Sequence, residues 1–334
     1  MRALAAAALV LAIAAGACDD TAFDDVAADI AEALNEEDGV GTPGDAAGGV
    51  ALISGRGGLD AFLDCLSDAR ATLVAAHRGG PAPGYPENAL ETFEHTLAQA
   101  PVLLEIDVAA TRDGALVLMH DDDLDRTSTC RGAVDDTRRS DLNGCRLVDN
   151  NGRRTDFAIP TLAEALDWAE GRTILELDIK PSVQFEDVVD AVRDAGAEDR
   201  VILITYSIGA AGVLARLAPE MTISVPVENP GDLTTLEDRG VDIDRILAWT
   251  GTETPRPRLY ETLDADDVPV IFGTLGGGNS IDAAIARSGD DGRYRELAID
   301  GVDLIATDRP VDAYRALRSR SDVAQSVSVC AGGG

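Results

Sequence analysis

Acidic side chains two residues apart stand in two apolar runs of the sequence. VLLEIDVA carries Glu105 and Asp107, and TILELDIK carries Glu176, Asp178 and Lys180, the only lysine in the chain. Residues two apart in a β-strand lie on the same face of the strand. A strand buried on both faces does not hold unpaired charges, so these side chains must bind one another or a ligand.

A histidine joins the first of these groups through a short connection. ALVLMHD follows VLLEIDVAAT with only TRDG between them, which is too short to join parallel strands. The two runs therefore predict an antiparallel hairpin. With TRDG as the turn, Ala110 pairs with Ala115, and His120 lies opposite Glu105 and beside Asp107. Two carboxylates and an imidazole at the end of a strand predict a metal and acid–base site.

The elements that must position these residues are short β-rich runs alternating with helical stretches such as TFEHTLAQA and FEDVVDAVRDA. The runs are TLVAAH, VLLEIDVA, TILELDI, RVILITYS, TISVPV, RILAWTG, VPVIFGT and VDLIATD. Eight buried strands separated by helices predict an α/β fold, a parallel (β/α)8 TIM barrel, with a doubly wound open sheet as the alternative. No GxGxxG or Walker motif follows any run, so the sequence does not support nucleotide binding.

The charge of the chain limits its partners. The 334 residues include 60 acidic and 28 basic ones, for a formal net charge of −32. Such a field repels nucleic acid and anionic lipid headgroups, so we expect no nucleic-acid partner. Phosphate chemistry would therefore need a local basic patch or a metal ion.

The N-terminus MRALAAAALVLAIAAGACDD has the pattern of a secretory signal that is too short to span a membrane. AAGAC is similar to a bacterial lipobox, which predicts lipidation of Cys18 and a lipoprotein of the cell envelope; cleavage by ordinary signal peptidase is the alternative. The predicted organisation is a signal peptide over 1–17, an acidic tether with N-terminal helices over 18–70, a barrel over 71–320 with an insertion over 121–159, and a tail over 321–334.

Cysteine usage agrees with export. Four cysteines remain after Cys18, an even number for an oxidising compartment. We expect a Cys130–Cys145 disulfide that closes a polar loop, and a Cys65–Cys330 disulfide that ties the start of the domain to its tail.

Five separated segments carry a resemblance to a known family. HRGGPAPGYPEN, EIDVAATRDGALVLMHDDDLDRT, IPTLAEAL, ELDIK and GVDLIATDRP resemble, in order and spacing, the glycerophosphodiester phosphodiesterases. The resemblance extends over residues 72 to 318. It implies a TIM-barrel enzyme that uses a divalent cation, Ca²⁺ or Mg²⁺, to hydrolyse small glycerophosphodiesters to sn-glycerol 3-phosphate and an alcohol.

The resemblance also implies roles for single residues. His77 and His120 become the acid–base pair, Glu105, Asp107 and Asp178 the metal ligands, and Arg78 and Lys180 the phosphate contacts. Asp178 stands where the family has a glutamate one methylene longer. The nucleophile is either water or the glycerol hydroxyl of the substrate. A cation and fixed basic side chains suit this chemistry because charge builds up on phosphoryl oxygens in the transition state.

Further residues have two interpretations each. Glu87 and Asn88 either cap the first helix of the barrel or help to hold the metal site, and Glu176 is either a metal ligand or a supporting pocket residue. Phe272-Gly273 replaces a Trp-Thr pair frequent in the family, which predicts a wider pocket wall. That wall keeps open a related barrel phospholipase acting on lysophospholipids or phosphoinositol head groups. A non-catalytic surface binding lipoprotein is the alternative outside the enzymes.

Overall fold

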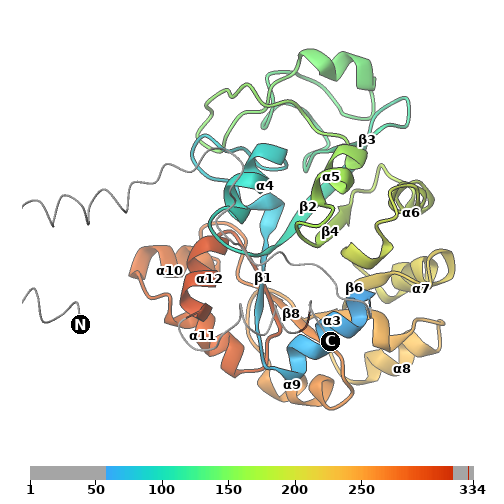
Figure 1. Ribbon diagram of the computed structural model, residues 1–334, viewed down its shortest axis with the longest axis vertical. Coiled ribbons are helices and arrows are strands. Elements are labelled where there is room, and N and C mark those ends of the chain that lie inside the picture. Colours follow the sequence, from blue (N-terminus) through green and yellow to red (C-terminus); the bar gives the residue numbers. More distant parts are fainter. Residues whose placement is uncertain (1–57, 319–329, 331–334) are drawn as a thin grey trace, which may run out of the picture. The chain divides into compact units, whose positions relative to one another are not determined.

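The eight predicted β-runs form one parallel sheet that closes on itself (Figure 1). The protein is represented by a computed structural model that describes residues 58–318 and Cys330. The parallel strands are β1 (Leu73–Ala76), β2 (Leu103–Ala110), β4 (Leu175–Ile179), β5 (Val201–Ile204), β6 (Thr222–Pro226), β7 (Ile246–Trp249), β8 (Val270–Gly273) and β9 (Leu304–Thr307). The first strand pairs with both β9 and β2, which closes the barrel and excludes the open doubly wound sheet.

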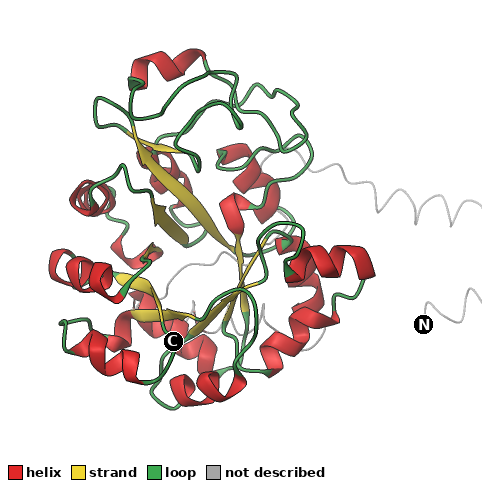
Figure 2. Cartoon of the chain, turned by 180° about the vertical axis from the view of Figure 1, so that it is seen from behind, coloured by secondary structure: helices red, strands yellow, loops and turns green. Residues whose placement is uncertain are grey.

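Helices surround this barrel on the outside, as Figure 2 shows from behind. They are α4 (Leu90–Leu97), α5 (Leu162–Ala169), α6 (Phe185–Asp194), α7 (Ile208–Leu217), α8 (Gly231–Glu237), α9 (Pro257–Asp264), α10 (Ile281–Ser288), α11 (Gly292–Ile299) and α12 (Pro310–Arg318). Local sequence sets their starts: Thr161 and Glu164 form a reciprocal capping box at the start of α5. The (β/α)8 prediction is confirmed.

Strand alternation divides the core into two layers. Ile271 and its inward-facing counterparts on other strands fill the barrel interior, whereas Phe272 is fully buried between barrel and helices. The expectation that Phe272 forms a pocket wall is therefore wrong, because successive residues of a strand face opposite sides. The neighbouring Gly273 leaves room for the Trp249 ring, since an added Cβ would lie 2.7 Å from the Trp249 Cη2 atom.

Helix α3 (Gly58–Asp68) precedes the first strand and packs against the inward-facing residues of the barrel strands. Its apolar face includes Leu59, Phe62 and Leu66, all buried with the inward-facing strand residues. The predicted disulfide between Cys65 and Cys330 is present and attaches this helix to the C-terminal tail.

The predicted hairpin exists, but its register differs by one residue. Strand β3 (Leu116–Leu118) runs antiparallel to β2, and Ala110 pairs with Leu116 instead of Ala115. The connection between the paired residues, 111–115, is one residue longer than TRDG. Thr111 closes it, because Thr111 N donates to the Ala115 carbonyl oxygen and the Thr111 hydroxyl accepts from Ala115 N. The ladder therefore does not place His120 opposite Glu105.

Several expectations concern residues outside the described part of the chain. These are the signal peptide, lipidation of Cys18, the tether before residue 58 and most of the C-terminal tail. Within residues 58–318, no helix is both long enough and apolar enough to span a membrane.

The turn after β1 is closely packed against helix α4. Gly79 has a φ of +79°, and an added Cβ would lie 2.2 Å from Cε1 of Phe93. We expect Gly79→Ala to lower the free energy of unfolding by about 3 kcal/mol, because overpacking adds to left-handed backbone strain.

Gly114 is the matched control, since it also has a φ of +79° but no heavy atom within 4 Å of an added Cβ. Gly114→Ala should cost only the backbone strain, about 1 kcal/mol. Urea denaturation measures both variants, and equal losses would contradict the packing argument.

Candidate active site

Four carboxylates lie on one face of two adjacent parallel strands. Glu105 on β2 is in register with Glu176 on β4, and Asp107 is in register with Asp178. All four side chains are buried. Ligand oxygens of Glu105, Asp107 and Asp178 lie within 4.8 Å of one another, so the structure brings together the three residues predicted to bind metal.

Lys180 neutralises part of this charge. Its Nζ lies 2.6 Å from Asp107 Oδ1 and 2.6 Å from Asp178 Oδ2. Burial opposes its charged form, but the two carboxylates outweigh burial and raise the pKa of Lys180 above its usual value. A compact ammonium at the end of a flexible stem fits between two close carboxylates, which explains the single lysine at this position.

Asn88 orients one of the carboxylates. Its Nδ2 donates to Asp107 Oδ2 at 2.7 Å, and its Oδ1 accepts from Asp107 N at 3.0 Å. Asn88 adopts a φ of +58°, a left-handed conformation that asparagine tolerates better than most residues. Burial opposes ionisation of Asp107, yet contacts with Lys180, Asn88 and the nearby His120 lower its pKa below the usual range.

The rest of the cluster is left with excess negative charge. Burial, reinforced by the charge of Asp107, raises the pKa of Glu105 well above its usual value, although Arg78 N donates to Glu105 Oε2 at 2.7 Å. Asp178 Oδ1 is buried and makes no hydrogen bond. An orphaned carboxylate oxygen beside two further carboxylates is a donor set that fits a hard divalent cation.

His77 is held by a carboxylate that the sequence analysis did not single out. Its Nδ1 lies 2.7 Å from Asp308 Oδ1, and Arg78 Nε lies 3.3 Å from its Nε2. Arg78 can only donate, so this geometry assigns the proton to Nδ1 and leaves Nε2 as an acceptor. Burial raises the pKa of Asp308, but the hydrogen bond and charge of His77 outweigh it and lower that pKa overall.

Asp308 is itself positioned by a buried carboxylate. Asp308 N donates to Asp282 Oδ2 at 2.7 Å, and Asp282 also accepts hydrogen bonds from Thr307 and Tyr294. Asp308 lies in the segment GVDLIATDRP, directly after β9, and β9 pairs with β1. The sequence could have indicated this contact, because Asp308 is a polar residue at the end of a strand that neighbours the strand before His77.

His120 is held by its neighbour in the chain. Its Nδ1 lies 2.7 Å from Asp121 Oδ1, and the Arg126 guanidinium donates to both Asp121 oxygens at 2.6 and 2.8 Å. Arg126 also donates to both oxygens of Glu87 at 2.8 and 2.9 Å. Arg78 Nη1 donates to Glu87 Oε1 at 3.0 Å, so ion pairs and hydrogen bonds connect His120 to His77.

Of the two roles considered for Glu87, the structure agrees with a place at the site, since Glu87 lines the outer cavity, and not with helix capping. It does not cap α4, whose N-terminal cap is Ala89 without a side-chain hydrogen bond. It is also not among the three clustered carboxylates. Buried between Arg78 and Arg126, it compensates their charges and fixes both guanidinium groups.

Two cavities meet at the side chain of His77. The inner cavity has a volume of about 430 Å³ and is lined largely by strand residues, including Glu105, Glu176, Asp178 and Trp249. The outer cavity has a volume of about 510 Å³ and is lined largely by loops, including Arg78, Glu87, Arg126, Asp149 and Gly276. The candidate site thus has an inner side, where carboxylates lie beside apolar strand residues, and an outer side formed by polar loops that include the insertion.

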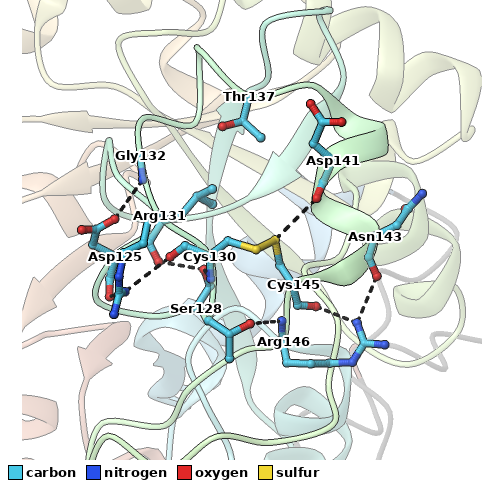
Figure 3. The surroundings of a disulfide bond; sticks show 12 residues. Asp125, Ser128, Cys130, Arg131, Gly132, Thr137, Asp141, Asn143, Cys145 and Arg146 are labelled. Carbon is cyan, nitrogen blue, oxygen red and sulfur yellow. Dashed lines mark hydrogen bonds between the residues drawn. A yellow bond between two sulfur atoms is a disulfide. The ribbon is translucent and has the colours of Figure 1, made fainter.

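The insertion is ordered by its own contacts. The predicted Cys130–Cys145 disulfide joins its two arms, as Figure 3 shows. Beside the disulfide, Gly132 N donates to Asp125 Oδ1 at 2.9 Å, and Arg146 Nη1 donates to the Cys145 carbonyl oxygen at 2.7 Å. These contacts stabilise the polypeptide that carries one wall of the outer cavity.

Comparison with known proteins agrees with this geometry. The sequence profile of the glycerophosphoryl diester phosphodiesterase family matches residues 77–254. The chain belongs to this family. A crystal structure of a glycerophosphoryl diester phosphodiesterase from Parabacteroides distasonis is 33% identical, with a TM-score of 0.72, over 80% of this chain and 94% of that one.

Two further comparisons cover different shares of the chain. A Bacillus altitudinis glycerophosphodiester phosphodiesterase is 30% identical over 162 residues, which is 46% of this chain. The match spans 66% of the length of that protein and of two other curated bacterial relatives. An Oleispira antarctica phosphodiesterase, solved with the product sn-glycerol-3-phosphate, is 21% identical, with a TM-score of 0.58, over 75% of this chain and 99% of that one; it shares the fold.

The Asp308–His77 contact leads to a first test of the site. Asp308→Asn keeps the shape of the side chain but removes the charge that stabilises protonated His77, so we expect kcat to fall about 100-fold or more. Asp312→Asn, on α12, is the matched control because Asp312 pairs with Arg309 and Arg315. Steady-state kinetics with glycerophosphocholine measures both variants, and equal kcat values would contradict the orienting role.

The two disulfides should have separable effects. Replacing Cys130 and Cys145 by serine frees a loop whose closure contributes about 3 kcal/mol, so we expect a lower Tm and a several-fold higher KM for glycerophosphocholine. Replacing Cys65 and Cys330 by serine should lower Tm without raising KM, because that disulfide attaches α3 and not the cavity wall. A KM that rises only in the second variant would contradict this assignment.

Proposed function

We propose that the protein hydrolyses glycerophosphodiesters to sn-glycerol 3-phosphate and an alcohol. The observation that carries the proposal is the buried triad of Glu105, Asp107 and Asp178 with Lys180 beside it, in a chain of this family. His77 lines both cavities, so a diester could extend from it in two directions. The product bound to the Oleispira antarctica phosphodiesterase agrees with this reaction.

The triad would hold one divalent cation, Ca²⁺ or Mg²⁺. Such an ion, when bound, stabilises the charge that builds up on the phosphoryl oxygens. Asp178 reaches one methylene less far than a glutamate, and its orphaned Oδ1 supports its place among the ligands. Glu105 and Asp107 lie across from it on β2.

The basic side chains of the site would bind the phosphate. Lys180 Nζ lies between two of the carboxylates, and Arg78 Nε lies 3.9 Å from Asp107 Oδ2. Both cations are partly buried and held by acidic partners, so they reach the phosphate already oriented. Charge-assisted hydrogen bonds from such groups are stronger than neutral ones.

The two histidines would transfer the protons. His77 carries its proton on Nδ1 beside Asp308, which leaves Nε2 to accept a proton from the nucleophile, water or the glycerol hydroxyl. His120, held by Asp121, would then protonate the leaving alkoxide. Each carboxylate fixes the ring of its histidine and stabilises the imidazolium form.

The alternatives have less support. The wider wall that favoured a lysophospholipase is absent at Gly273, where the Trp249 ring occupies the space. A binding protein without catalysis would not need two histidines that are each paired with a carboxylate. Catalysis on small glycerophosphodiesters therefore remains the proposal.

Export is the proposed setting of this activity. Two disulfides among the described residues suit an oxidising compartment. We propose a signal peptide at the N-terminus and a lipid anchor on Cys18 as the only membrane attachment.

Metal dependence provides the decisive test of the reaction. We expect EDTA-treated protein to release no glycerol 3-phosphate from glycerophosphocholine, and Ca²⁺ or Mg²⁺ to restore release. Asp178→Asn should lower both activity and metal affinity, since it removes one ligand charge. Asp187→Asn, exposed on α6, is the matched control.

The result could contradict the proposal in two ways. Release that is insensitive to the chelator would exclude the triad as a catalytic metal site. Release from lysophospholipids but not from glycerophosphocholine would establish the phospholipase alternative instead.

A further inference from the structure

Glu176 is a buried acid that the proposed mechanism does not use. Its side chain is 1% exposed, and its Oε1 has no hydrogen-bond partner. The two nearby cations are engaged elsewhere: Lys180 binds Asp107 and Asp178, and Arg78 binds Glu87. A carboxylate oxygen in such a position is costly unless a ligand donates a hydrogen bond to it.

Its place in the sheet separates Glu176 from the metal ligands. Glu176 precedes Asp178 by two residues on β4, so it faces the same way one step deeper in the barrel. It lines the inner cavity together with Glu105 and Asp178. It is not one of the three carboxylates whose oxygens converge within 4.8 Å.

Most of the other side chains that line the inner cavity with Glu176 are apolar or aromatic. Its walls above the carboxylates come largely from apolar and aromatic side chains, namely Ile204, Tyr206, Pro226, Trp249, Ile271 and Leu275. Most of these side chains belong to strands, which enclose the cavity on several sides. A small group with carbon atoms for the walls and a hydroxyl for the unpartnered oxygen of Glu176 would satisfy both features.

We propose that Glu176 is a specificity-determining residue that accepts a hydrogen bond from a glycerol hydroxyl of the substrate. The glycerol moiety then occupies the inner cavity, and the alcohol moiety, which varies in size, lies in the outer cavity among loops. This inference rests on the proposed function, since it names the part of the diester that each cavity receives.

Binding of product analogues tests the inference without turnover. We would measure the Kd of sn-glycerol 3-phosphate and of n-propyl phosphate, which lacks both hydroxyls, by calorimetry on the Ca²⁺-loaded full chain. We expect the wild-type protein to bind sn-glycerol 3-phosphate about 10- to 100-fold more tightly. Glu176→Gln should bring the two Kd values close together, mainly by weakening sn-glycerol 3-phosphate.

Glu176→Asp provides a second variant that keeps the carboxyl group but withdraws its oxygens by one methylene. It should also reduce the preference for sn-glycerol 3-phosphate over n-propyl phosphate. Thermal melts identify any variant that does not fold. Ca²⁺ affinity should stay unchanged in Glu176→Gln, unlike in Asp178→Asn. A matching loss of Ca²⁺ affinity would overturn the inference, because Glu176 would then be a metal ligand.

Two other results would also overturn it. A wild-type protein without preference between the two phosphates would show that no hydroxyl is recognised, even if glycerophosphocholine is hydrolysed. Phosphocholine binding that weakens in Glu176→Gln, with sn-glycerol 3-phosphate unaffected, would assign the inner cavity to the alcohol. Failure of the proposed function would appear separately, as absence of metal-dependent glycerol 3-phosphate release.

Discussion

The burial of four carboxylates on adjacent strands is the constraint on which the rest of the site depends. Glu105, Asp107, Glu176 and Asp178 cannot all be charged in a dry interior without compensation. Lys180 compensates part of that charge within the chain, and a divalent cation would compensate more. The same arrangement that is costly for folding thus provides an anionic site that can bind a cation. The bound cation could in turn bind a phosphate.

Ion pairs continue the compensation of charge from this cluster outward into the loops. Arg78 bridges the carboxylates and Glu87, and Arg126 bridges Glu87 and Asp121. The insertion is therefore attached to the barrel by buried or half-buried ion pairs as well as by packing. Orientation of His120 depends on this attachment, since Asp121, which holds its imidazole ring, is itself held by Arg126.

Much of this architecture could be predicted because it follows from local periodicity. Alternating runs were sufficient for the barrel, and the two-residue period was sufficient for the acidic face that includes Asp178. The hairpin register could not be predicted, because it depends on how the Thr111 backbone and hydroxyl close the turn. Asp308 and Arg126 were missed as partners, because spacing along a chain does not show which distant side chains meet. The resemblance implied a pocket wall at Phe272, but strand alternation turns this side chain away from the barrel interior.

Closure of the barrel has a consequence for when the protein can become active. His77 follows the first barrel strand and Asp308 follows the last, 231 residues later in the chain. The pair forms only after β9 has docked between β1 and β8, which requires nearly the whole domain to have been synthesised. Nascent or truncated chains would keep an unaligned imidazole and remain latent.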